Sequence, residues 1–100
     1  MGDILDVSGH KIAIIREDGE VHNLMGQKIG RVLSSGEVHN NEGEKIGSLR
    51  ANGYVYNYEG NHIGTVHGDG KIYDIKNHYL GKVVGDHMEL GGAALLLLIR

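Results

Sequence analysis

Aliphatic residues recur along the chain with a constant period of 17 residues. In each period one aliphatic residue stands two positions after a glycine, and two more follow eight and eleven positions further on. The first set is Ile4, Val21, Val38, Val55 and Ile72, and the later pairs are Ile12 and Ile15, Ile29 and Val32, Ile46 and Leu49, Ile63 and Val66, and Leu80 and Val83. A constant period indicates one small unit repeated in tandem. We therefore divide the chain into five repeats, residues 2–18, 19–35, 36–52, 53–69 and 70–86.

Two turn signals divide each repeat. An Asp or Asn stands four positions after the leading glycine, and a second glycine follows three positions later. This spacing is typical of a type I turn closed by a residue in the left-handed conformation. In the last repeat Asn77 replaces that glycine, and Asn adopts this conformation more readily than most residues. A second turn ends each repeat, as in Glu17-Asp18-Gly19. The Asp and Asn residues of the first turn are Asp6, Asn23, Asn40, Asn57 and Asp74.

Two turns in so short a unit leave two strands of about four to seven residues, so each repeat is predicted to be a hairpin. The chain is then an all-β meander of about ten strands, and closure into a barrel would remove its two unpaired edges. Ile29 and Val32 are three positions apart, which places them on opposite faces of a regular strand. We expect a bulge at the intervening Gly30, and at its equivalents, to bring them together.

Residues 91–99 carry no polar side chain. As a helix they would measure about 14 Å, against roughly 30 Å for the hydrocarbon core of a bilayer, so we expect no transmembrane span. A helix that is apolar on every side must be buried all round. We therefore predict a short helix at about residues 88–99 that fills the centre of the barrel and contacts the aliphatic residues of the repeats. The pattern leaves open whether this tail fills its own barrel or a neighbour's.

The repeat Gly-x-Val-x-Asn-x-x-Gly-x-x-Ile-Gly-x-Val, followed by Gly-Gly-Ala-Ala-Leu-Leu-Leu-Leu, resembles the β-flower family over essentially the whole chain. In that family hairpin petals surround a central hydrophobic helix, an architecture similar to the tubby C-terminal and phospholipid-scramblase-like barrels. The resemblance implies one domain over residues 1–100, with the five repeats as petals. The tubby-like barrels suggest binding to a membrane surface, although no basic cluster in this sequence matches such a site.

Composition narrows the function classes. A chain of 100 residues forms one domain. The absence of cysteine excludes disulfides, thiolate zinc sites and cysteine nucleophiles. A net charge of −3 argues against nucleic-acid binding, which requires a basic face. Residues 1–4 lack the basic start and apolar run of a signal peptide, so we expect a cytoplasmic protein, with peripheral membrane association as an alternative.

The seven histidines are the first candidates for chemistry. Two of them share a repeat position with two tyrosines, and a position that accepts either ring favours a packing role. The alternative is a girdle of rings that binds a metal or a small ligand. The four residues of this girdle are His22, His39, Tyr56 and Tyr73. The spacing of His62, His67 and His78 matches no zinc motif, and we predict surface positions for them. We expect no bound metal and no cofactor.

Lysines recur at another shared position, at Lys11, Lys28 and Lys45. Because acidic residues such as Glu20 and Glu37 are interspersed, cross-strand ion pairs explain these lysines better than an anion site does. Turn formation explains the recurring Asp and Asn residues better than a calcium site does. The sequence contains no evident Ser/His/Asp set, so we do not expect an enzyme.

The remaining hypothesis is a non-catalytic binding or interaction module that uses the petal tips or the barrel rim. Leu24, Met25 and Tyr58 are apolar residues at predicted tips and are candidate contact residues. A membrane- or lipid-associated domain is the alternative, and a histidine-based binder of a metal or small ligand is the third hypothesis. The partner is then an unidentified protein or lipid, and the sequence leaves the oligomeric state open.

Overall fold

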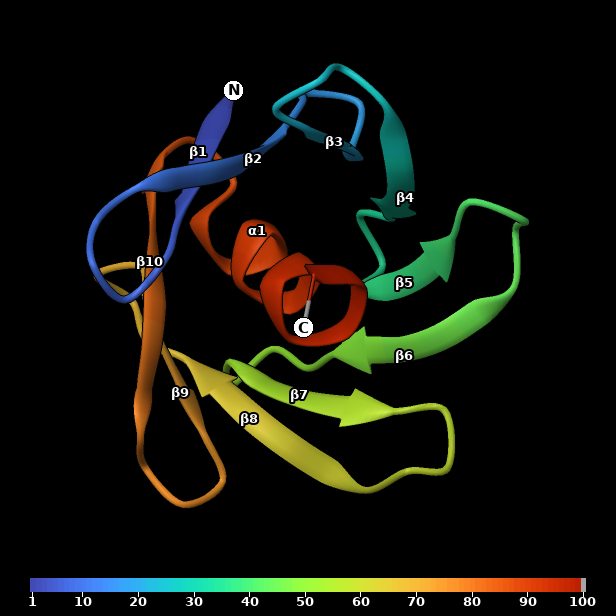
Figure 1. The fold of residues 1–100 in the computed structure, drawn as a ribbon. Helices are drawn as coiled ribbons and strands as arrows, with labels where there is room; N and C mark the ends of the chain where they lie inside the picture. Colours follow the sequence, from blue (N-terminus) through green and yellow to red (C-terminus); the bar gives the residue numbers. More distant parts are fainter. Residues whose placement is uncertain (100) are drawn as a thin grey trace.

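The computed structural model describes residues 1–99, and Arg100, the last residue of the predicted domain, lies outside the described residues. Ten antiparallel strands form a closed barrel in which β1 pairs with β10. The hairpins surround a central helical tail, as the sequence predicts (Figure 1). The strands are β1 (Gly2–Leu5), β2 (Lys11–Ile15), β3 (Glu20–Asn23), β4 (Lys28–Val32), β5 (Glu37–Asn40), β6 (Lys45–Leu49), β7 (Tyr54–Asn57), β8 (His62–Val66), β9 (Lys71–Asp74) and β10 (Tyr79–Gly85). The tail comprises α1 (Met88–Ala94) and the π-helix η1 (Leu95–Ile99).

A petal turn joins the two strands of each repeat, and its Asp or Asn side chain holds it together. In repeat 2 the backbone N–H groups of Met25 and Gln27 donate to Oδ1 of Asn23 at 2.9 and 3.0 Å. Gly26 closes the turn with a φ of 82°, and Asn77 takes the same role in repeat 5 with a φ of 69°. The predicted turn chemistry is confirmed, and it accounts for the recurring Asp and Asn side chains.

A linking turn joins each repeat to the next and brings two strand ends into close contact. The N–H of Val32 donates to the carbonyl oxygen of Gly19 at 2.9 Å. A Cβ atom added at Gly19, where φ is 88°, would collide with the carbonyl oxygen of Val32. The same bond recurs in the following three repeats. Glycine is therefore required both for the left-handed backbone and for the close approach.

The predicted bulge occurs in every repeat, one residue earlier than expected. In repeat 2, Val21 pairs with Gly30 and His22 pairs with Lys28, so that Ile29 is the extra residue. Gly30 and Val32 then both face the barrel interior, and Ile29 packs partly buried against the core. The glycine therefore does not make the bulge; it lies beside the bulge and leaves space for the tail.

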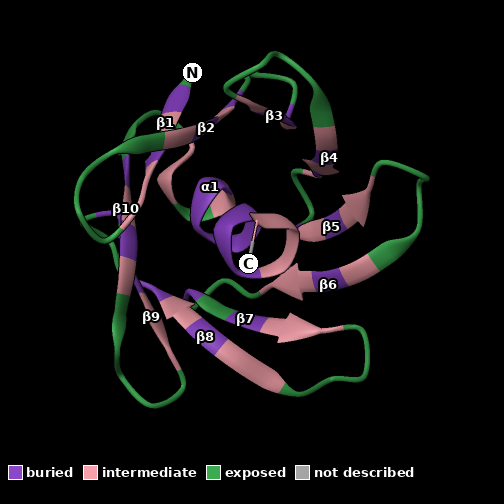
Figure 2. Cartoon of the chain, in the orientation of Figure 1, coloured by how far each residue is buried: buried purple, intermediate pink, exposed green. Residues whose placement is uncertain are grey.

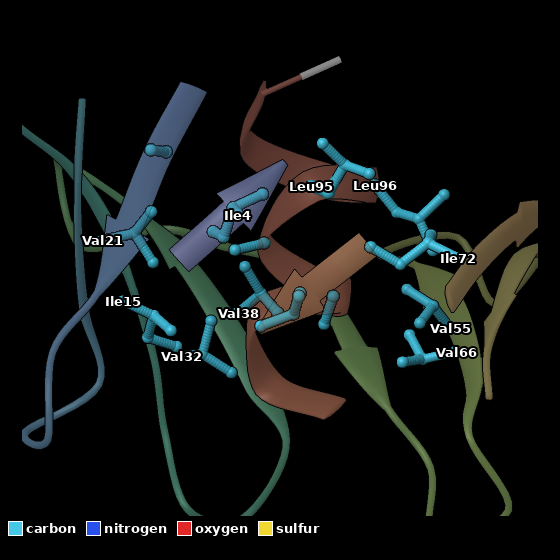
Figure 3. Packing of buried hydrophobic residues seen from close by; sticks show 14 residues of the cluster. Ile4, Ile15, Val21, Val32, Val38, Val55, Val66, Ile72, Leu95 and Leu96 are labelled. Carbon is cyan, nitrogen blue, oxygen red and sulfur yellow. The ribbon is translucent and has the colours of Figure 1, made fainter. Parts of the chain in front are cut away.

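The core lies between the strands and the tail, as the colours of Figure 2 show. Valine and isoleucine side chains from successive strands point inward, and Leu95 and Leu96 project from the tail on the side of Ile72 (Figure 3). Within α1, Gly91 and Gly92 lie against the side chains of Val83 and Val66. A Cβ at Gly92 would collide with Val66, so these glycines let the tail start close to the barrel wall.

Consecutive leucines of the tail face consecutive petals. Methyl carbons of Leu95, Leu96, Leu97 and Leu98 lie 3.3, 2.8, 2.6 and 2.6 Å from Cβ atoms built at Gly81, Gly64, Gly47 and Gly30, respectively. An α-helix turns by about 100° per residue, more than the roughly 72° between five evenly spaced petals. A π-helix, with i→i+5 hydrogen bonds, turns less per residue. The π-helical geometry of η1 therefore matches one leucine to one petal.

Candidate functional site

The outer face of each petal carries four side chains at equivalent positions, which we call an outer quartet. Strand residues alternate between faces, so neighbours of the inward Val21, Gly30 and Val32 point outward. Cross-strand pairing then groups them within one hairpin. The quartets are Asp3, Leu5, Lys11 and Ile14 (quartet 1); Glu20, His22, Lys28 and Arg31 (quartet 2); Glu37, His39, Lys45 and Ser48 (quartet 3); Tyr54, Tyr56, His62 and Thr65 (quartet 4); and Lys71, Tyr73, Tyr79 and Lys82 (quartet 5).

Quartets 1 to 3 are held by ion pairs. In quartet 2 the carboxylate of Glu20 lies 3.9 Å from Nζ of Lys28 and 3.8 Å from Arg31. Lys11 pairs with Asp3 at 3.5 Å and Lys45 with Glu37 at 4.0 Å. The predicted pairing of the recurring lysines with acidic residues is thus confirmed. The acidic and basic side chains neutralise one another across the two strands of each hairpin.

His22 and His39 are bound within their own petals. Nδ1 of His22 lies 3.2 Å from the carbonyl oxygen of Gly26, and Nε2 lies 3.1 Å from Oε1 of Glu20. His39 repeats both contacts, at 3.1 Å each, with Gly43 and Glu37. The hydrogen bond from His39 and the charge of Lys45 lower the pKa of Glu37 below its ordinary value.

Quartet 4 replaces ion pairs with stacked rings. The rings of Tyr54 and His62 are parallel, with centroids 4.5 Å apart, and Tyr56 lies 5.4 Å from the same histidine. The guanidinium of Arg50 lies 4.5 Å from the ring centroid of Tyr56, within cation–π range. His62, predicted at the surface, is half-buried by these contacts.

In quartet 5 the tyrosine rings of Tyr73 and Tyr79 are 5.7 Å apart, and His67 lies 4.7 Å from Tyr73. Two lysines complete the quartet. The predicted girdle is thus divided: two histidines lie in ionic quartets, and Tyr56 and Tyr73 lie in aromatic ones. All four girdle residues point away from the barrel axis, so their ring contacts and hydrogen bonds are local. Their role in binding a ligand stays a prediction.

The predicted tip residues are strongly exposed. Leu24, Met25 and Tyr58 are 62%, 80% and 73% accessible, and Val7 and Ile75 occupy equivalent tips with similar exposure. The petal turns point away from the tail in different directions (Figure 1). Leu24 and Met25 therefore lie side by side on one tip, while Tyr58 belongs to a separate petal. Their contact role also stays a prediction.

A groove that the sequence did not indicate lies where the tail begins. Two adjoining depressions, of about 640 and 580 Å³, share Ser34, Ser35, His87 and Leu90, and we call them together the rim groove. The linking turns of four repeats contribute to the walls, and Met88 and Leu90 of the tail contribute apolar surface. Each turn sequence is unremarkable alone, and only barrel closure brings the four turns together around residue 87.

Charged groups of both signs line the rim groove. Arg31 and Asp18 lie along one depression, and Arg50 and Glu89 lie along the other. The backbone N–H of Glu20 donates to Asp18 at 3.0 Å and, with the charge of Arg31, lowers the pKa of Asp18 below its ordinary value. Among the buried side-chain nitrogen and oxygen atoms of residues 1–99, only Nε of Arg31 has no hydrogen-bond partner.

His87 stands at the centre of the rim groove in a strained conformation. Its φ of 59° and ψ of 41° are left-handed, and its side chain makes no hydrogen bond to the start of α1. Among non-glycine residues 1–99, only His87 and Asn77 have a positive φ. A histidine in this region costs on the order of 1 kcal/mol or more relative to glycine. Such strain is concentrated at functional sites in proteins.

Within residues 1–99, no group of three or more His, Asp or Glu side chains is arranged to hold a metal ion. In the same part of the chain, none of the helices combines the length and the apolar composition needed to cross a membrane. Comparisons of the chain with protein families, with characterised proteins and with solved structures gave no match. The candidate site therefore rests on the geometry of this chain alone.

Proposed function

We propose that this protein is a non-catalytic binding module of the β-flower type whose ligand occupies the rim groove. The observation that carries the proposal is the groove itself, because its depressions have the volumes of small-ligand sites and polar groups from several turns converge on them. The strained His87, which lines both depressions, supports it. The ligand is a short polar segment or molecule with an apolar group, to match Met88 and Leu90.

Ligand screening by NMR of the isotopically labelled protein tests this proposal. The probes are a library of polar fragments and tripeptides, and the readout is the set of backbone amide signals that shift. We expect the shifts to concentrate at Ser34, Ser35 and residues 87–90. Ser34→Trp should abolish them because the exposed Ser34 side chain lies at the shared wall and an indole would fill the space.

Asn41→Trp is the matched control, because Asn41 is also an exposed turn residue but lies on a petal tip. This variant should bind as the parent does. Shifts confined to the petal tips, or shifts unchanged by Ser34→Trp, would overturn the assignment of the site to the rim groove.

The alternative function is peripheral membrane association through the petal tips. The exposed apolar side chains of Leu24, Met25 and Tyr58 favour it. Flotation with neutral and anionic liposomes decides between the two functions. Membrane binding predicts co-flotation that is lost in a variant with all three residues changed to Ser, whereas the rim-groove proposal predicts protein that stays at the bottom of the gradient.

A further inference from the structure

Quartet 5 differs from the other quartets in its charge. Acidic and basic side chains cancel in quartets 1 and 3, quartet 4 has neither, and quartet 2 has one acidic residue for two basic ones. Quartet 5 has two lysines and no acidic residue. We propose that quartet 5 is a docking surface for an acidic peptide segment of a partner protein. This surface is separate from the rim groove.

The two lysines of quartet 5 are direct neighbours. Lys71 on β9 is in register with Lys82 on β10, and both side chains point outward. Like charges directly opposite each other on adjacent strands are unfavourable. The equivalent pair in quartet 2 is Glu20 and Arg31, which attract each other. The ion pairs of residues 1–99 include neither Lys71 nor Lys82.

Asp69, in the preceding linking turn, only partly balances the two lysines. The backbone N–H of Lys71 donates to the Asp69 carboxylate at 3.0 Å. This hydrogen bond, together with the charges of Lys71, His67 and Lys82, lowers the pKa of Asp69, so the carboxylate stays ionised. One carboxylate facing two ammonium groups leaves a net positive surface. A ligand with carboxylates complements that surface.

The tyrosines define the rest of the ligand. Tyr73 and Tyr79 are in register beside the lysine pair, and Tyr79 is exposed. Their rings offer apolar contact next to the ammonium groups, so the segment should carry an aliphatic or aromatic residue between acidic ones. Because the barrel is closed and its strands are paired on both sides, the segment cannot add to the sheet as a strand. Side chains must therefore hold it.

A peptide suits this surface better than a nucleic acid does. The lysine pair is small, and the adjoining quartets 1 and 4 carry no net charge. A long polyanion that extended beyond quartet 5 would therefore find no further unpaired lysines there, whereas a segment of a few residues fits within quartet 5. We therefore assign a short acidic segment of a protein as the occupant.

The test titrates the peptide acetyl-Asp-Glu-Leu-Glu-Asp-amide into the labelled protein and follows its amide NMR signals at low salt. We expect shifts at Lys71, Tyr73, Tyr79 and Lys82, and none with the isosteric neutral peptide acetyl-Asn-Gln-Leu-Gln-Asn-amide. Lys71→Glu and Lys82→Glu should each weaken binding by at least about tenfold, because each removes a charge-assisted contact and adds a repulsive one.

Lys76→Glu is the matched control, since Lys76 lies on the tip of the same petal and the change in net charge is identical. Its affinity should stay within about twofold of the parent's, because an exposed charge outside the site contributes little. Equal weakening by Lys76→Glu, shifts outside quartet 5, or tighter binding of oligothymidylate than of the peptide would each overturn the proposal. Thermal melting checks the fold, and Lys71→Glu should be at least as stable as the parent because it restores an opposite-charge pair.

Discussion

Gly64 lies directly against Leu96, since a Cβ atom at Gly64 would come within 2.8 Å of both methyl carbons of that leucine. The same hypothetical atom would lie 2.7 Å from the carbonyl oxygen of Tyr73. The side chain and the backbone therefore confine this position from two sides. Glycine is needed here for space, because Gly64 is absent from the residues with a positive φ.

Gly64→Ala should therefore destabilise the protein by about 1–3 kcal/mol, the usual cost of overpacking a core. Gly68→Ala is the control, because a Cβ at Gly68 meets open space and its φ is not positive. That variant should be neutral or more stable by up to about 1 kcal/mol. Urea denaturation of both variants measures the difference, and equal stabilities would show that the tail does not pack against Gly64.

Asn40 organises its petal turn, whereas its neighbour Asn41 is exposed at the tip. Oδ1 of Asn40 accepts hydrogen bonds from the N–H groups of Glu42 and Glu44 at 2.9 and 3.0 Å. Asn40→Ala should lower the free energy of unfolding by about 1–2 kcal/mol, because two turn hydrogen bonds are lost. Asn41→Ala should change it by less than about 0.5 kcal/mol. Similar losses for the two variants would contradict this account of the turn.

A comparison of His87 with Asn77 distinguishes the effect of backbone strain at the rim groove from the effect of backbone strain elsewhere. Both residues have a positive φ, but Asn77 lies in a petal turn. Replacement by Gly should stabilise the protein by up to about 1 kcal/mol in each case, since Gly adopts this conformation without steric cost. Only His87→Gly should also reduce binding of a rim-groove ligand. Loss of binding in Asn77→Gly as well would point to a global change instead.

Three carboxylates should make the stability of the fold depend on pH. The pKa values of Asp18, Glu37 and Asp69 are lowered in the fold, mainly by hydrogen bonds from Glu20, His39 and Lys71, respectively. A lowered pKa means that the unfolded chain binds these protons first as the pH falls. The stability that these groups contribute is fully present above the ordinary glutamate pKa of 4.5, and it declines as the pH falls below that pKa.

Acid titration of the unfolding midpoint measures this decline. Glu37→Gln should make the unfolding midpoint fall less steeply below pH 4.5, because a glutamine side chain does not titrate. Glu42→Gln is the control, because Glu42 is an exposed tip residue outside the ion pairs of residues 1–99. A steeper decline in Glu37→Gln than in the parent would reverse the sign assigned to this group.

The hairpins, the barrel and the central tail could be predicted because their determinants are local. Glycine and Asx spacing specifies the turns, and the apolar run of the tail has no other place to be buried. The bulge position was one residue off, since Ile29 and Gly30 are adjacent and the pattern alone does not distinguish them. The π-helical form of η1 follows from the spacing of the petals around the tail, and that spacing exists only once the barrel has closed.

The candidate surfaces were harder to predict because they also form only when distant segments meet in the closed barrel. The rim groove joins Ser34, Arg50 and His87, which only the closed barrel brings together. The quartets, in contrast, could have been found from the sequence once the bulge was placed, because their members recur at the 17-residue period. The missing signal was the register of the two strands. With that register, Lys71 and Lys82 become an evident like-charge pair.

Successive leucines of the tail match successive petals, and a double-mutant cycle tests this match most directly. Gly64→Ala and Leu96→Ala form the matched pair, and Gly30→Ala with Leu96→Ala forms the mismatched pair, because Gly30 faces Leu98. We predict that Leu96→Ala relieves part of the destabilisation caused by Gly64→Ala, with a coupling energy of at least about 1 kcal/mol. The two changes of the mismatched pair should be additive within about 0.5 kcal/mol. Equal coupling energies for the two pairs would contradict this match.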